Sequence, residues 1–271
     1  MSSGRDIRWF RLFRKETNRS VIIALDHGLY MGPIEGIKNV EQVLKGVIEG
    51  GADAVIVTPG ILKKWSRVLA GSNLGIILRV DHLGMFHKFK QSKLCPHLIC
   101  GIEEAVALGA DGVIASYYVG LDDEFLSMKL VSEVVRGCRR YGLVSVIELS
   151  ILERNLSKEE YAETVSKVSR VLSELGADLL KIPYTGDPET FRDLVTSCLS
   201  PVVVLGGPRR ESLRDFLKDI EEAVSSGAIG VAVGRNVWQH KNFEKIIEVL
   251  VKIVHEGISL NDVVNTIGSI T

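Results

Sequence analysis

Lys181 stands inside an otherwise apolar run, Gly176-Ala-Asp-Leu-Leu-Lys-Ile-Pro, which leads into a loop rich in Gly and Pro. An unpaired ammonium group is costly to bury, and burial pushes the pKa of a lysine downward. A lysine that is neutral near pH 7 attacks carbonyl carbon and can form a Schiff base. The pattern also fits a lysine that snorkels from a strand end or pairs with a buried carboxylate. This stretch alone leaves both kinds of role open.

Asp26 and His27 follow directly after another apolar run, Val21-Ile-Ile-Ala-Leu25. A carboxylate placed near Lys181 would act as a general base, and each group would perturb the pKa of the other. The alternative for Asp26 is a structural one, in which it caps the turn after the strand. His27, and His82 after a later strand, are candidates for substrate contact or are ordinary loop residues.

Two glycine-containing loops have the composition of an anion site. Gly206 and Gly207 follow one apolar strand, and Gly234 with Arg235 follows the next. Glycine lets the backbone amides approach a ligand closely, and Arg235 can add a bidentate contact. Tight turns between strand and helix would also use these glycines. Because the last two loops of a barrel commonly hold phosphate, we expect a phosphate site here.

The elements that must position these residues show an internal repeat. The phrase Gly-Ala-Asp followed by an apolar run occurs at 51–57, 109–115 and 176–182, and a fourth copy at 227–233 has Ile229 in place of Asp. Each copy follows a helical stretch, so the Gly is expected to end the helix. The Asp is expected to bind backbone amides where the chain enters the strand. The copies predict repeated β-α units.

Eight apolar strands are predicted in all, near residues 21, 54, 76, 112, 144, 178, 202 and 229, with helical periods between most of them. Strands that are apolar throughout and separated by helices indicate a parallel sheet. No Gly-x-Gly-x-x-Gly follows the first strand, so a closed (β/α)₈ TIM barrel is favoured over a doubly wound sheet. We expect one domain over 1–271. Residues 1–18 are expected to form a helical extension whose amphipathic helix packs on the outside of the main domain.

Composition narrows the function classes. The chain has 271 residues, is 46% hydrophobic and carries a net charge of −1, which points to neither nucleic acid nor an anionic membrane as partner. We find no signal peptide and no apolar run long enough to span a bilayer, and so expect a cytoplasmic protein. Cys95, His97 and Cys100 lack the second ligand pair of common zinc sites, so free thiols are favoured over a metal.

Four segments, in order and at predicted strand ends, resemble the archaeal-type class I aldolases. They are Asp26-His-Gly28 with Gly32-Pro33, Lys181 with Tyr184-Thr-Gly-Asp-Pro188, Gly206-Gly-Pro208, and 231–239. This family contains archaeal fructose-bisphosphate aldolases and 2-amino-3,7-dideoxy-D-threo-hept-6-ulosonate synthase of aromatic amino-acid biosynthesis. The resemblance covers about residues 17 to 256.

The resemblance implies specific roles. Lys181 would be the Schiff-base lysine and Asp26 an active-site acid/base. A sugar phosphate would bind Gly206, Gly207, Gly234 and Arg235, and we expect His27 and Tyr184 to contact substrate as well. It also implies a homo-oligomer of barrels, with no metal and no cofactor beyond the covalent Schiff base.

One departure concerns the acid/base group. These enzymes carry a catalytic tyrosine, usually followed by Pro-Arg, where this chain has Ser150-Ile-Leu, and Glu148 stands two residues earlier. A serine hydroxyl is a far poorer acid than a perturbed phenol or carboxyl. Either Glu148 has taken over proton transfer, or a tyrosine reaches in from Tyr117, Tyr118 or Tyr184. Alternatively, Glu148 only pairs with Lys181.

We therefore expect a class I aldolase that acts on a phosphorylated ketose, most like one that cleaves fructose 1,6-bisphosphate into two triose phosphates. The alternative within the family is the aminodeoxyheptulosonate synthase. An alternative of another class is a sugar-phosphate-binding protein whose catalysis is altered or lost, because Ser150 replaces the tyrosine.

Overall fold

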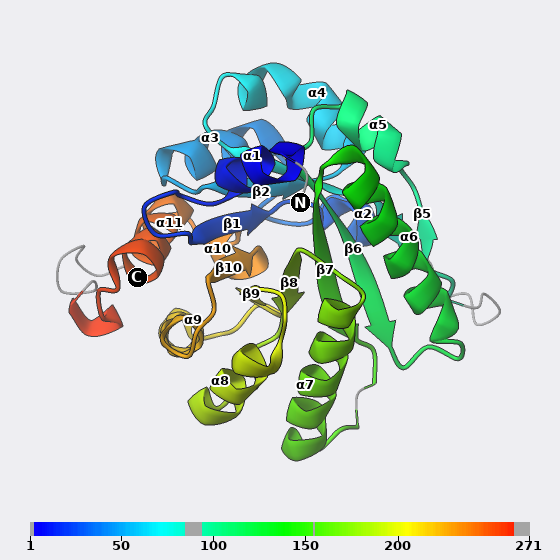
Figure 1. Ribbon diagram of the computed structural model, residues 1–271. Coiled ribbons are helices and arrows are strands. Elements are labelled where there is room, and N and C mark those ends of the chain that lie inside the picture. The colour runs from blue at the N-terminus through cyan, green and yellow to red at the C-terminus, as the bar shows by residue number, and fades with distance from the viewer. Residues whose placement is uncertain (1–2, 85–93, 154, 263–271) are drawn as a thin grey trace.

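The computed structural model describes residues 3–84, 94–153 and 155–262, which form a closed barrel of eight parallel strands surrounded by helices (Figure 1). Around the barrel the order is β1-β10-β9-β8-β7-β6-β3-β2. The barrel strands are β1 Ser20–Ala24, β2 Ala54–Val57, β3 Gly75–Arg79, β6 Gly112–Val119, β7 Val144–Ile151, β8 Leu179–Ile182, β9 Val202–Leu205 and β10 Gly230–Val233. The predicted (β/α)₈ barrel is confirmed, with a strand at each expected position.

The outer layer consists of helices that follow the strands. They are α3 Val40–Glu49, α4 Pro59–Ala70, α5 Ile102–Ala107, α6 Phe125–Tyr141, α7 Lys158–Glu174, α8 Pro188–Ser197, α9 Leu213–Ser225 and α11 Phe243–Val251, continued by the π-helical turn Lys252–Glu256. Two single-turn helices, α2 Gly28–Met31 and α10 Arg235–Trp238, follow β1 and β10. A two-stranded antiparallel sheet, β4 Asp81–His82 with β5 His97–Leu98, extends the loop after β3.

Successive side chains of each strand face two different cores. In β1, Val21 and Ile23 face the layer between strands and helices, while Ile22 and Ala24 face the barrel interior. This alternation is the two-residue period of a strand, and it explains why the strands are apolar throughout. The interior is thus packed with side chains, and polar groups enter it mainly near the carboxyl ends of the strands.

The repeated Gly-Ala-Asp phrase has the structural role expected of it. Its glycines, at 51, 109, 176 and 227, have φ between 79° and 113°, a conformation that side chains with Cβ rarely adopt. Its aspartates accept a hydrogen bond from the backbone N–H of a neighbouring strand. The three bonds are Asp53 Oδ2 with Val21, Asp111 Oδ2 with Ile76 and Asp178 Oδ2 with Ser145.

The N-terminal helix α1 (Ser3–Leu12) forms as expected and packs over one end of the barrel. Trp9, Leu12 and Phe13 pack into the barrel's interior core, so α1 closes the end at which the strands begin. The arginines of this segment bind the repeat aspartates: Arg5 binds Asp178, Arg11 binds Asp111 and Arg14 binds Asp53. The sequence showed an amphipathic helix but not which face of the barrel it covers.

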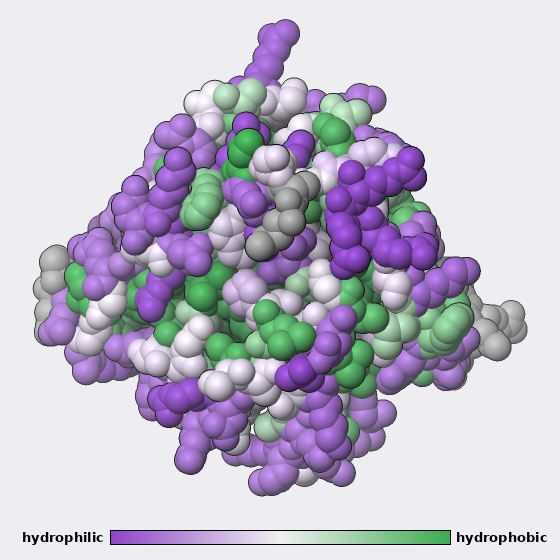
Figure 2. Space-filling view, viewed as in Figure 1, coloured by the Kyte–Doolittle hydropathy of each residue, from purple (hydrophilic) through white to green (hydrophobic). Residues whose placement is uncertain are grey.

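The face seen in Figure 2 is mostly hydrophilic, with smaller hydrophobic patches toward the middle of the view. Within the described residues, every helix is too short or too polar to cross a membrane.

Candidate active site

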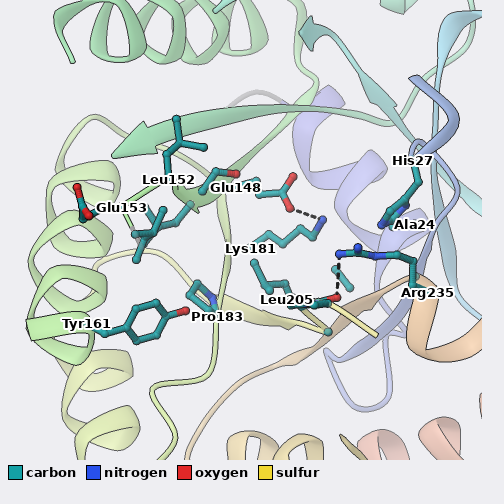
Figure 3. Close-up of a pocket in the computed structure, with 18 residues that line it drawn as sticks. Ala24, His27, Glu148, Leu152, Glu153, Tyr161, Lys181, Pro183, Leu205 and Arg235 are labelled. Atoms are coloured by element: carbon teal, nitrogen blue, oxygen red, sulfur yellow. Dashed lines mark hydrogen bonds and ion pairs between the residues drawn. The ribbon is translucent and has the colours of Figure 1, made fainter. Parts of the chain in front are cut away.

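Lys181 lies near the carboxyl end of β8, and its side chain is buried against Glu148 of β7. The two residues are register partners on adjacent strands, and Lys181 Nζ is 2.7 Å from Glu148 Oε1 (Figure 3). Burial of the ammonium is therefore compensated by a carboxylate, which was one of the alternatives for this position. Such a pair does not exclude a nucleophilic role, because Glu148 also provides a base for the lysine's proton.

Arg79, at the end of β3, is the centre of the polar network on the other side of Glu148. Its Nε donates to Asp26 Oδ2 at 2.7 Å, its Nη1 donates to Asp81 Oδ1 at 3.1 Å, and its Nη2 contacts Glu148 Oε2. Only 2% of its surface is exposed. Sequence reasoning missed this residue. The signal was available, since Arg79 is a charged residue in the apolar run Gly75–Val80, just as Lys181 is in its own.

Both carboxylates that contact Arg79 across the barrel are held in the ionised form. Burial alone would raise the pKa of Glu148, but the charges of Lys181 and Arg79 outweigh it and lower that pKa to about 2. Burial likewise opposes ionisation of Asp26, yet Arg79 and the neighbouring His27 hold its pKa well below the usual range. Asp81 differs, because burial outweighs its contact with Arg79 and leaves its pKa raised.

Of the tyrosines considered as replacements for the missing acid/base, Tyr118 alone lies in this network. Its hydroxyl donates to Asp81 Oδ2 at 3.0 Å, and burial, reinforced by the charge of Asp81, raises its pKa. Tyr117 points into the layer between strands and helices. Tyr184 points away as well: its hydroxyl donates to Glu222 Oε2 of α9 at 2.9 Å, and its ring packs on Phe191. The expected substrate contact of Tyr184 therefore has no support in the geometry.

The two glycine-containing loops lie side by side next to Lys181. Arg235 Nη2 donates to the carbonyl of Gly207 at 3.3 Å, while its Nε is buried and has no partner among the described residues. Asn236, which sequence reasoning did not single out, ties the loops together by donating to the carbonyls of Gly206 and Pro208 at 2.7 and 2.9 Å. The side chain of Arg235 and the backbone of Gly206 and Gly207 thus line one wall of the pocket.

Close packing explains why position 234 is glycine. A Cβ on Gly234 would lie 2.5 Å from Cε1 of His27 and 3.1 Å from the carbonyl oxygen of Ala24. His27 packs edge-on against Trp238, and its Nδ1 is 3.4 Å from Asp26 Oδ1. His27 thus connects the Asp26 side of the site to the glycine loops. His82, in β4, stacks its ring on Tyr30, and its Nε2 lies against the carbonyl oxygen of Leu29.

A pocket of about 390 Å³ joins these groups. Its wall includes eight of the ten residues predicted for the site, and Asp26 and Tyr184 are the two that do not line it. The predicted residues on this wall are His27, Glu148, Ser150, Lys181, Gly206, Gly207, Gly234 and Arg235, and Asp26 lines the adjoining pocket beside Arg79. Ser150 lies two residues beyond Glu148, on the same face of β7.

Tyr161 is a further residue on this wall that sequence reasoning did not select. Ser157 begins α7 with a capping box to Glu160, and this places Tyr161 in the first turn. Figure 3 shows its hydroxyl directed toward Pro183, on the side of the pocket opposite Arg235. Burial raises its pKa. No pattern marked Tyr161, because its place depends on how α7 packs.

Metal-binding geometry is absent from the described part of the chain, where no three potential ligand side chains come together. Cys95 is exposed and Cys100 is buried, and the ring of His97 contacts the carbonyl of Cys95.

Comparisons with known proteins match nearly the whole chain. The profile of the DeoC/LacD family aldolases matches residues 20–240. The class 1 fructose-bisphosphate aldolase of Thermoproteus tenax is 31% identical over 264 residues, which cover 95% of this chain and 97% of that protein. The 2-amino-3,7-dideoxy-D-threo-hept-6-ulosonate synthase 1 of Archaeoglobus fulgidus is 33% identical over 266 residues, with 98% and 96% covered.

A solved structure extends this likeness to the fold. An archaeal fructose-1,6-bisphosphate aldolase, with its catalytic lysine covalently bound to the carbinolamine intermediate of its substrate, superposes with a TM-score of 0.80. It is 31% identical, and the match covers 93% of this chain and 99% of that one.

Proposed function

The chain belongs to the DeoC/LacD family of aldolases, and we propose that it forms its Schiff base through Lys181 with a ketose that carries a phosphate. It is a class I aldolase, as the resemblance of its motifs implied. The observation that carries the assignment of Lys181 is its position: it is buried in the pocket wall between a carboxylate and the two glycine loops.

Proton transfer to and from the lysine is assigned to Glu148. Glu148 first takes a proton from the ammonium, and the free amine then attacks the carbonyl carbon of the ketose. Glu148 returns this proton to the former carbonyl oxygen, which leaves as water once a second proton from nitrogen has reached it. The products are an iminium ion and one water molecule, so charge is conserved and Glu148 ends ionised. This cycle needs a carboxylate within hydrogen-bond reach of Nζ, which the 2.7 Å contact provides.

Cleavage of the C–C bond follows from the iminium ion. A base removes the proton of the hydroxyl group on the far carbon, that carbon becomes an aldehyde, and the bonding electrons move onto the iminium nitrogen. Asp26 and Glu148 are the carboxylates that line the pocket beside Lys181, and we assign this base to one of them. Ser150 occupies the place of the family tyrosine and contributes at most a hydrogen bond.

Phosphate binding is assigned to the loops after β9 and β10. The backbone amides of Gly206 and Gly207 and the side chain of Arg235 would hold the phosphate, and Gly234 leaves room for His27 beside it. The covalent bond to Lys181 takes the place of a cofactor. A homo-oligomer remains a prediction.

Fructose 1,6-bisphosphate is the first substrate to test, because the similarity extends to fructose-bisphosphate aldolases in both sequence and structure. The aminodeoxyheptulosonate synthase activity is the second candidate, since the relative named for it is similar to the same degree.

Reductive trapping tests the assignment. The protein is incubated with dihydroxyacetone phosphate, reduced with borohydride, digested and sequenced by mass spectrometry. We expect an adduct on Lys181, none without reductant and none in Lys181→Met. Saturable binding of the phosphate compound without any adduct would refute the aldolase mechanism and leave a sugar-phosphate-binding protein.

A further inference from the structure

We propose that Arg79 is a positioning residue that joins Asp26 to Glu148 and keeps both carboxylates in place while the charge on Lys181 changes during the reaction. The inference rests on the proposed function, because it concerns the carboxylates that serve Lys181. Arg79 touches neither Lys181 nor the phosphate loops in the described contacts, so its effect passes through Asp26 and Glu148.

Arg79 connects strands that are not neighbours. In the barrel, β3 is separated from β1 by β2 and from β7 by β6. Its guanidinium group nevertheless contacts the carboxylate that follows β1 through Nε and the carboxylate on β7 through Nη2. A planar group with donors on three nitrogens can hold two carboxylates in fixed directions, whereas a lysine ammonium is a single point charge.

The guanidinium group is itself fixed from a third direction. Nη1 donates to Asp81 Oδ1 and to the hydroxyl of Ser116, at 3.1 and 3.0 Å. Asp81 is held in turn by the backbone N–H of Ser116 and the hydroxyl of Tyr118. The ring of Tyr30 lies 5.8 Å from the centre of the guanidinium group. All three guanidinium nitrogens thus have carboxylate partners, and the group has little freedom to turn.

The charges around this network explain why the reaction needs such a cation. In the resting site, Asp26, Asp81 and Glu148 face Arg79 and Lys181. The nitrogen of Lys181 is uncharged as the free amine, as the carbinolamine and as the enamine. In those states Lys181 carries no charge. Among the described contacts, Arg79 is then the arginine or lysine that still holds a positive charge against Asp26 and Glu148. Its positive charge therefore favours return of the proton from Glu148 to the substrate and keeps Asp26 ionised when the lysine no longer does so.

The ionisable groups that face the two carboxylates or Arg79 come from six elements or the loops beside them. They are Asp26 and His27 after β1, Tyr30 in α2, Asp81 in β4, Tyr118 in β6, Glu148 in β7 and Lys181 in β8. Removing the positive charge of Arg79 leaves the carboxylates facing one another, which raises the pKa of Asp26 and Glu148. A carboxylate with a raised pKa is protonated at a higher pH, so base-dependent activity is lost at a higher pH as the solution is acidified.

The test uses Arg79→Met and Arg79→Lys and measures the pH dependence of kcat for ketose cleavage. We expect the acidic limb of Arg79→Met to move upward by about one pH unit or more, with kcat about 100-fold lower. KM should change less than about threefold, because the phosphate loops are untouched. Arg79→Lys keeps the charge but cannot hold both carboxylates, so an intermediate kcat and a smaller shift are expected.

Two controls keep this result separate from the proposed function and from misfolding. Borohydride trapping on the unsubstituted protein must give the Lys181 adduct; if it does not, the proposed function has failed, whatever Arg79 does. If Arg79→Met does not fold by circular dichroism, Arg79→Lys decides alone. An acidic limb and kcat equal to those of the unsubstituted protein in a folded Arg79 variant would overturn the inference.

Discussion

Glu148 binds Lys181 through Oε1 and Arg79 through Oε2, so one carboxylate connects the lysine of the proposed Schiff base to a permanent cation. Glu148 therefore lies at the centre of the site. Each group on this path can be changed separately, and the consequences differ.

Glu148→Gln removes the proton carrier but keeps the size of the side chain. We expect the rate of adduct formation with dihydroxyacetone phosphate to fall about 100-fold, because an amide can neither accept nor return the lysine's proton. Rapid quenching with borohydride measures this rate. Glu163→Gln, on the exposed face of α7, is the matched control and should leave the rate unchanged. An unchanged rate in Glu148→Gln would assign proton transfer to another group.

Ser150→Tyr introduces the tyrosine that the resemblance of the motifs implies at this position. Residues 148 and 150 share a face of β7, so the new phenol would reach the same pocket. We expect it to recover part of the cleavage activity that Glu148→Gln loses, when the two changes are combined. If the double variant is no faster than Glu148→Gln alone, the interpretation of Ser150 as a replaced acid/base is wrong.

Arg235→Gln removes the arginine of the proposed phosphate site. A charge-assisted hydrogen bond contributes about 1.5–3 kcal/mol, so KM for a phosphorylated ketose should rise roughly 10- to 100-fold. Adduct formation with dihydroxyacetone, which has no phosphate, should scarcely change, and this comparison is the internal control. An equal loss with both compounds would show that Arg235 shapes the pocket rather than binding phosphate.

Acid should weaken the fold partly through Glu148. Its pKa falls from 4.5 to about 2 on folding, so its stabilising effect is complete above pH 4.5 and is lost as the pH drops toward 2. We expect the free energy of unfolding in urea to decline between pH 5 and pH 3 more steeply in the unsubstituted protein than in Glu148→Gln. If the free energy of unfolding declines equally in both proteins as the pH falls, ionisation of Glu148 does not contribute to the loss of stability in acid.

Trp9→Ala tests the closure of the barrel by α1. Trp9 is buried and stacks on Phe13 with ring centres 4.2 Å apart, so its loss should destabilise the fold by about 3–5 kcal/mol. Ile7→Ala, on the exposed side of the same helix, should change stability by less than about 0.5 kcal/mol. The kcat of folded Trp9→Ala should be normal, because α1 lies at the opposite end of the strands from Lys181. A large loss of kcat in the folded variant would contradict this separation.

The fold and most of the site could be predicted because the relevant signals are local. Eight apolar runs and a repeated Gly-Ala-Asp define the barrel, and a barrel brings all strand ends together, so Asp26, Lys181 and the glycine loops had to converge. Asp187 belongs to one of the segments that carry the resemblance, and its side chain caps α8 by accepting from the N–H of Thr190.

The features of the site that could not be predicted from the sequence depend on the direction in which side chains point across the barrel. Arg79 is visible in the sequence as a charged residue within an apolar run. Its three carboxylate partners, however, lie 53, 2 and 69 positions away along the chain. Tyr184 follows the lysine strand closely, but its hydroxyl is taken by Glu222, while Tyr161 reaches the pocket from a helix. These outcomes follow from packing between layers, which no single run of residues records.

The arginines of the N-terminal segment have a consequence for how the chain is assembled. Carboxylates occur at three of the four equivalent points of the repeated unit, and Ile229 stands at the fourth. Because one of the four positions lacks a carboxylate, the four positions are not equivalent. Arg5, Arg11 and Arg14 therefore pair with the three aspartates in a single orientation of the N-terminal segment. The N-terminal segment therefore makes its three ion pairs together only when the second, fourth and sixth strands of the barrel, which follow these aspartates, are all in place.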